Sequence, residues 1–163
     1  MSETIKVGMA DLKLCKAPDS VTTLGLGSCV GVALRDPITK VGGLAHVMLP
    51  DSTQFDSSMN IAKFADTGTK ELVRLMVAAG ANKSRIVAKI AGGAQMFSIG
   101  GGKGGSLVAV GERNVMAVKK VLEELKIPIL ASDTGLNFGR TVIFYPETGD
   151  YVIKAVGKGE KTI

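Results

Sequence analysis

The sequence predicts an α+β fold, a layered α/β sandwich in which mixed β-sheets pack with two long helices. Strand-like runs are frequent toward both ends of the chain, and the two helical segments lie between them. This order lacks the regular strand–helix alternation that is typical of βαβ folds. The chain has 163 residues and 45% hydrophobic content, enough for one proper core, so we expect a single domain over residues 1–163.

Seven runs of apolar or alternating residues predict β-strands. They cover residues 5–9, 12–15, 30–35, 41–49, 85–91, 141–145 and 151–156. A turn signal, Asp36-Pro37, separates the third run from the fourth, and these two runs therefore predict a β-hairpin. The basic tail over residues 157–163 is expected to be frayed.

Two longer segments carry apolar residues at helical spacing. The first covers residues 62–79 and is followed by Gly80, a residue that commonly ends helices. The second covers residues 113–125, and Pro128 lies beyond its end. These segments are the two long helices of the expected fold.

Cys29 and His46 are the candidates for chemistry. Cys29 lies in a glycine-flanked run, Thr-Leu-Gly-Leu-Gly-Ser-Cys-Val over residues 23–30, and His46 is the only histidine of the chain. A thiol becomes a strong nucleophile when a base takes its proton, and a neutral imidazole is the usual base. If the chain does cysteine chemistry, His46 must be the base.

The expected hairpin brings this pair together. With Pro37-Ile38 at the centre of the turn, Cys29 and His46 become direct cross-strand partners, whose Cβ atoms lie ~4.5–5.5 Å apart on one face. A loop of odd length, or a bulge at Gly42-Gly43, would shift this register by one residue. The glycines before Cys29 also allow the backbone N–H groups of Ser28 and Cys29 to converge on one point, as an oxyanion requires.

Composition and motifs argue against several other classes of function. The net charge of +5 is spread along the chain and aromatic residues make up only 4%, so nucleic-acid binding is disfavoured. One histidine and two well-separated cysteines form no zinc spacing, and we expect no metal and no cofactor. The start of the chain does not resemble a signal peptide, and no apolar stretch approaches the ~18 residues of a membrane span. We therefore expect a cytoplasmic protein without membrane insertion.

A glycine-rich stretch over residues 92–105 contains the spacing G-x-G-x-x-G at Gly100, Gly102 and Gly105. A strand-like run over residues 106–110 follows it, whereas a phosphate-binding loop leads into a helix. We therefore expect a flexible surface loop there. Cys15 is interpreted as a small buried residue without a role, and both cysteines as reduced thiols.

Five blocks of the sequence resemble the CheD family of chemoreceptor glutamine deamidases. They are Thr-Leu-Gly-Leu-Gly-Ser-Cys-Val (23–30), Arg-Asp-Pro (35–37), Ala-His-Val-Met-Leu-Pro (45–50), Lys-Ile-Ala-Gly-Gly-Ala (89–94) with Met96-Phe97, and Gly-Glu-Arg-Asn-Val (111–115). The first two blocks together are specific, and the resemblance runs over nearly the whole chain. The segment Gly-Leu-Asn-Phe-Gly-Arg (135–140) departs from the Gly-Gly-Asn-Arg run expected in the family.

The resemblance implies a fold similar to the catalytic domains of bacterial cytotoxic necrotizing toxins. It implies Cys29 as nucleophile, His46 as base and Thr23 as the group that orients the imidazole. The implied reaction converts receptor glutamines to glutamate with release of ammonia. The implied partners are the cytoplasmic helical region of chemoreceptors, as substrate, and the CheC phosphatase, as a regulatory partner.

Two alternatives stay open at this point. The first is that the chain is a regulatory binding module for a CheC-type phosphatase, with little hydrolytic activity. The same thiol would also serve another cysteine reaction, such as transglutamination or esterase activity on methylated receptor glutamates, because these reactions share the thioester intermediate or its attack geometry.

Overall fold

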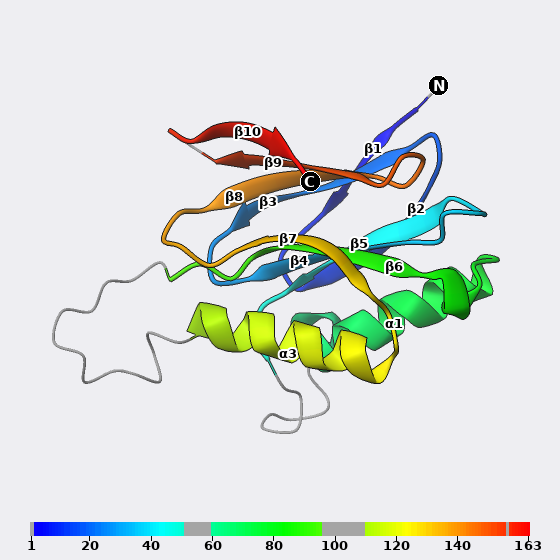
Figure 1. The fold of residues 1–163 in the computed structure, drawn as a ribbon, viewed down its shortest axis with the longest axis horizontal. Coiled ribbons are helices and arrows are strands. Elements are labelled where there is room, and N and C mark those ends of the chain that lie inside the picture. The colour runs from blue at the N-terminus through cyan, green and yellow to red at the C-terminus, as the bar shows by residue number, and fades with distance from the viewer. Residues whose placement is uncertain (1, 51–59, 96–109, 156) are drawn as a thin grey trace, which may run out of the picture.

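The computed structural model describes residues 2–50, 60–95, 110–155 and 157–163. Figure 1 shows three layers: one β-sheet, a second β-sheet packed on it, and two helices that cover the outer face of the second sheet. Each sheet has five strands and contains both parallel and antiparallel pairs. The prediction of an α+β fold with mixed sheets and two long helices is confirmed.

The first sheet joins the two ends of the chain. Its strands, in order across the sheet, are β1 (Thr4–Val7), β3 (Ser20–Leu26), β8 (Arg140–Tyr145), β9 (Asp150–Ala155) and β10 (Gly159–Thr162). β1 pairs with β3 in parallel, and the remaining pairs are antiparallel. Its inner face packs on the second sheet.

The second sheet lies between the first sheet and the helices. Its strands, in order, are β2 (Asp11–Lys16), β5 (Val41–Val47), β4 (Val30–Arg35), β6 (Val87–Gly92) and β7 (Ile129–Thr134). Because both faces are covered, the central strands β4 and β5 are buried almost throughout. Strand residues therefore alternate between two hydrophobic cores.

The two long helices are α1 (Ala65–Ala78) and α3 (Val110–Glu124), within a few residues of their predicted bounds. Two short 3-10 helices, η2 (Ile61–Lys63) and η3 (Lys83–Arg85), flank α1 and the start of β6. Leu72 and Met76 of α1 are fully buried in the core between the helices and the second sheet. Burial of one such side chain contributes about 1.5–3 kcal/mol. No helix in the described part of the chain is long and apolar enough to cross a membrane.

The hairpin between β4 and β5 forms, but its predicted register is wrong. His46 pairs with Gly31, two residues beyond Cys29. The reason is the length of the turn: the N–H of Asp36 donates to the carbonyl of Val41 at 2.9 Å, so four residues rather than two separate the strands. A shift of two residues keeps the same faces, because side chains alternate with period two. Cys29 and His46 therefore still belong to the same inner face.

Three strands were not predicted. β3 and β7 were not recognised as strands, and β10 occupies the tail that was expected to be frayed. The four residues of β10 are exposed, so this strand has no apolar pattern to reveal it. Backbone pairing with β9 and an ion pair of 2.6 Å between Lys161 and Asp133 hold it in place.

The glycine-rich segment is described only in part. Gly92 ends β6, while residues 96–109, including Gly100, Gly102, Gly105 and most of the strand-like run, lie outside the described residues. Val110 begins α3. The strand-like interpretation of residues 106–110 is therefore wrong at Val110, the one residue of that run that the structure describes.

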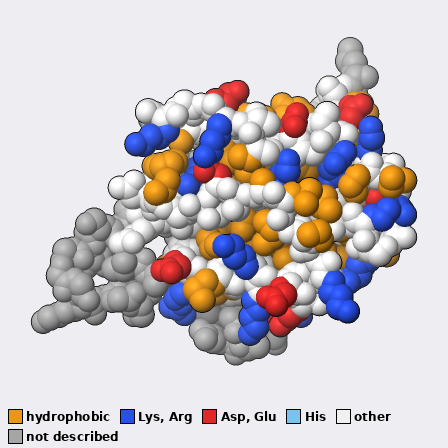
Figure 2. Space-filling model, in the orientation of Figure 1, with side chains coloured by type: hydrophobic (Ala, Val, Ile, Leu, Met, Phe, Trp, Pro, Cys, Tyr) orange, Lys and Arg blue, Asp and Glu red, His pale blue; other side chains and the backbone are white. Residues whose placement is uncertain are grey.

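Charged side chains are mixed on the face of the molecule seen in Figure 2. Lysine and arginine side chains are scattered across it, with aspartate and glutamate between them. This distribution agrees with the spread of charge along the sequence.

Candidate active site

Thr23 and His46 meet in the core between the two sheets. Thr23 lies on β3 of the first sheet and His46 on β5 of the second, and both side chains are buried. The Oγ1 of Thr23 lies 2.7 Å from the Nδ1 of His46. The contact proposed from the family resemblance is therefore present as a hydrogen bond.

The other partner of Thr23 determines which ring nitrogen carries the proton. Thr23 Oγ1 also donates to the carbonyl oxygen of Val7 on β1, at 2.8 Å. A hydroxyl has one proton, and a carbonyl only accepts, so Thr23 must accept the hydrogen bond from Nδ1–H of His46. The neutral imidazole then carries an unprotonated Nε2, which is the form that a general base requires.

This Nε2 is buried, and in the described part of the chain it has no hydrogen-bond partner, the thiol of Cys29 included. Cys29 lies in the turn between β3 and β4, is 8% exposed, and belongs to the same inter-sheet core. Catalytic hydrogen bonds are often long in the absence of substrate and shorten when it binds. The structure thus places a thiol and a base of the right tautomer on one inner face.

The turn that carries Cys29 is fixed through its backbone. The carbonyl oxygens of Gly27 and Cys29 accept hydrogen bonds of 2.8 Å from the N–H groups of Ala94 and Gly93. The intervening carbonyl, that of Ser28, accepts from the Nδ2 of Asn114 at 2.9 Å. Three successive carbonyls are therefore held by the segment after β6 and by α3. The use of the Ser28 and Cys29 N–H groups as oxyanion donors stays a prediction.

Burial sets the charge state of both candidate groups. It raises the pKa of the Cys29 thiol, and a hydrogen bond from the residue's own backbone N–H offsets this only in part. Burial also lowers the pKa of His46 from its ordinary value of 6.5. At neutral pH the resting pair is therefore a thiol and a neutral imidazole, so the thiol must be deprotonated during the reaction.

Protein stability is expected to fall between about pH 7 and pH 5 because of His46. The folded pKa lies below the ordinary value of 6.5, so the folded protein binds fewer protons than the unfolded chain in this range. The stability associated with a neutral His46 is complete above the unfolded pKa and is lost as the pH falls toward the folded pKa. Melting temperatures of wild type and His46→Gln across this range test the prediction. An equal pH dependence in both proteins would contradict it.

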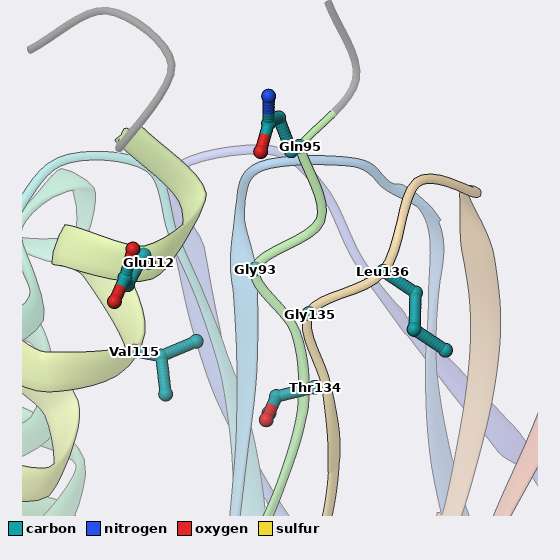
Figure 3. Close-up of a pocket in the computed structure, with 7 residues that line it drawn as sticks. All are labelled: Gly93, Gln95, Glu112, Val115, Thr134, Gly135 and Leu136. Carbon is teal, nitrogen blue, oxygen red and sulfur yellow. The ribbon is translucent and has the colours of Figure 1, made fainter. Parts of the chain in front are cut away.

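A pocket of about 240 Å³ opens beside the turn that carries Cys29. Figure 3 shows its walls: Glu112 and Val115 come from α3, Gly93 and Gln95 follow β6, and Thr134, Gly135 and Leu136 lie at the end of β7. Cys29 itself is not among these residues. The pocket is nevertheless adjacent to it, because Gly93 donates its N–H to the Cys29 carbonyl.

The segment that departs from the family pattern forms part of this region. Leu136 lines the pocket, is 65% exposed, and accepts a hydrogen bond at its carbonyl from the N–H of Gln95. The ring of Phe138 lies 4.6 Å from the guanidinium carbon of the buried Arg140. Leu136 of this segment therefore lies at the rim beside the candidate site, and the segment contains neither the thiol, the imidazole nor the hydroxyl of that site.

Sequence reasoning missed the contribution of α3. Asn114 and the pocket residues Glu112 and Val115 all belong to the block Gly-Glu-Arg-Asn-Val, which was noted as a family block without a role. Cys15, by contrast, lies on β2 as a free, buried thiol. Burial and the nearby charge of Asp19 raise its pKa to about 12.

The fold and this site together define a class: layered α+β proteins of two mixed sheets with a thiol and a hydroxyl-oriented imidazole between them. A family model described as CheD chemotactic sensory transduction matches residues 48–155. The chain belongs to the CheD family.

Curated relatives extend this match over the full chain. A protein of Lachnoclostridium phytofermentans, named a probable chemoreceptor glutamine deamidase CheD, is 60% identical over 163 residues, which is 100% of both chains. Similar proteins with the same name come from Syntrophomonas wolfei, 53% identical over 100% of both chains, and from Caldanaerobacter subterraneus, 51% identical over 99% of both. Their aligned ranges include the segment of Thr23, Cys29 and His46, which precedes the match to the family model.

Proposed function

We propose that the protein is a chemoreceptor glutamine deamidase, a hydrolase that converts receptor glutamine side chains to glutamate and releases ammonia. The family and the shared name of full-length relatives support the reaction and its substrate. One observation of the site carries the chemistry: the hydrogen bond between Thr23 and His46, which leaves the Nε2 of His46 free to accept a proton.

The first half of the proposed mechanism forms a thioester. The Nε2 of His46 takes the proton of Cys29, and the thiolate attacks the side-chain amide carbon of the receptor glutamine. Backbone N–H groups of Ser28 and Cys29 stabilise the oxyanion. The imidazolium then returns its proton to the leaving nitrogen, the carbon–nitrogen bond breaks, and ammonia departs.

The second half releases the product. His46, neutral again, takes a proton from a water molecule, which attacks the thioester carbon. The carbon–sulfur bond breaks, the proton on His46 returns to the Cys29 sulfur, and glutamate remains on the receptor. Cysteine thiol and imidazole end in the state in which they began, so the cycle needs no cofactor.

The proposal extends to the setting of this reaction. Its substrate is the cytoplasmic helical region of chemoreceptors, which places the protein in the cytoplasm. The two-sheet core is proposed to be similar to that of the cytotoxic necrotizing toxin catalytic domains, which also deamidate glutamine through a cysteine. A CheC-type phosphatase is the proposed regulatory partner. CheC binding that survives in Cys29→Ala would separate this second role from catalysis.

Mass spectrometry of a receptor fragment treated with the protein tests the proposed reaction. Deamidation replaces an amide with an acid and gives a small, defined mass increase on glutamine-containing peptides. Added amine in the buffer distinguishes transglutamination, which would attach the amine instead, and a methylated fragment distinguishes esterase activity, which would remove methyl groups. A receptor fragment left without acid formation at glutamine would overturn the proposal.

A further inference from the structure

Asn114 lies where the ladder between β4 and β5 ends. The last pair of that ladder joins Val30 to Val47. Asn114 is fully buried on α3, and its Nδ2 donates to the carbonyl oxygens of Ser28, at 2.9 Å, and Met48, at 3.0 Å. One side-chain amide from outside the sheet thus joins the two segments just beyond their last backbone pair.

These two carbonyls belong to the segments that carry the candidate catalytic pair. Ser28 immediately precedes Cys29, and Met48 lies two residues after His46. Movement of either segment would change the separation of thiol and imidazole, and a misplacement of about 1 Å is enough to cost an enzyme about 10²-fold in rate. We infer that Asn114 is a positioning residue, which holds the thiol segment and the imidazole strand together for proton transfer.

The helix that carries Asn114 also packs against the segment after β6, which is hydrogen-bonded to the turn that carries Cys29. Gly111, one turn earlier on α3, lies so close to the carbonyl oxygens of Gly93 and Ala94 that a Cβ at this position would collide with both. Gly93 in turn donates its N–H to the carbonyl of Cys29. The close approach at Gly111 therefore sets the distance between α3 and the segment after β6. That distance in turn determines whether the Asn114 side chain can contact the carbonyl of Ser28.

Chemistry also dictates the orientation of the Asn114 amide. Both neighbours are carbonyl acceptors, so the NH₂ group must face them and Oδ1 must point away. Oδ1 is buried and has no hydrogen-bond partner in the described part of the chain. An apolar side chain would avoid the free-energy cost of this unpaired acceptor. Local costs of this kind are expected at functional sites, where a specific contact outweighs them.

The inference rests on the proposed function, because it assumes that His46 takes the proton of Cys29. Its test is alkylation of Cys29 by iodoacetamide, followed peptide by peptide with mass spectrometry, which needs no receptor. We expect His46→Gln to slow alkylation at neutral pH by about 10-fold in the wild-type background. In the Asn114→Ala background, the same change should have no further effect, because the pair is already separated.

Val118→Ala is the matched control. Val118 lies one turn further along α3 and is fully buried in the helix-side core, so its truncation loosens the helix without removing either hydrogen bond to Ser28 or Met48. His46→Gln should keep its full effect in this background. Cys15, buried in the inter-sheet core, reports on general opening in the same samples, since its alkylation rises only when the fold loosens.

The outcomes separate the inference from the proposed function. If Asn114→Ala is not recovered folded, Asn114→Ser takes its place, because one hydroxyl proton cannot bridge two carbonyls. An equal effect of His46→Gln with and without the Asn114 amide would overturn the inference. Absence of any effect in wild type would overturn it together with the mechanism. A protein with the expected His46 dependence that fails to deamidate a receptor would overturn the proposed function alone.

Discussion

Cys29→Ala is expected to abolish ammonia release from a receptor fragment, with a decrease in kcat of about 10⁴-fold or more. Without the thiol no thioester forms, and His46 alone offers only weak assistance to attack by water. Ammonia measured by a coupled assay, together with mass spectrometry of the receptor peptides, gives the two readouts. Circular dichroism should show an intact fold, because the substitution removes only the sulfur atom from a core that remains otherwise filled.

Cys15→Ala is the control for this result. Cys15 is also a free, buried thiol that packs in the inter-sheet core, so the chemical change and its packing cost are the same. It lies on β2, away from the turn between β3 and β4, and its loss should leave kcat within about twofold of wild type. Undiminished ammonia release by Cys29→Ala, or an equal loss in both variants, would contradict the assignment of Cys29 as nucleophile.

The hairpin shows which features the local sequence pattern can predict and which it cannot. Alternation and the Asp36-Pro37 signal were sufficient to predict both strands and the turn between them. The number of residues in the turn was not predictable from these signals, since it depends on where Asp36 and Val41 begin to pair. The error was an even number of residues, so the faces survived it. Cys29 and His46 therefore share an inner face as predicted, although they are not the direct cross-strand partners that the predicted register made them.

Most of the features that could not be predicted from the sequence depend on contacts between segments far apart in the chain. Nothing within α3 itself indicates that Asn114 meets carbonyls from two strands, because Ser28 and Met48 are 86 and 66 residues away. β10 is another such case, as its exposed polar residues become a strand only because β9 offers a free edge. The thiol and the imidazole were predictable from their chemistry, whereas their supports depend on the assembled layers.

Thr23→Val is expected to lower kcat by about 10²-fold while it changes KM little. Valine matches the shape of threonine but has no hydroxyl, so the Nδ1–H of His46 loses its acceptor and the carbonyl of Val7 loses the hydrogen bond from the Thr23 hydroxyl. The proton is then free to occupy Nε2, where it blocks the base, and the ring is free to rotate. Thr23→Ser, which keeps the hydroxyl, should recover most of the activity, and steady-state kinetics on a receptor fragment measure both variants.

Thr22→Val separates this tautomer effect from a simple loss of stability. The hydroxyl of Thr22 donates to the carbonyl of Val142 at 2.6 Å, so its removal also takes one hydrogen bond from a buried carbonyl on the first sheet. Each valine variant should therefore lose about 1–3 kcal/mol of unfolding free energy. Only Thr23→Val should also lose activity, because only Thr23 contacts His46. If both variants lose kcat to the same extent, the hydroxyl of Thr23 acts through the fold alone, and the orientation of the imidazole must come from another group.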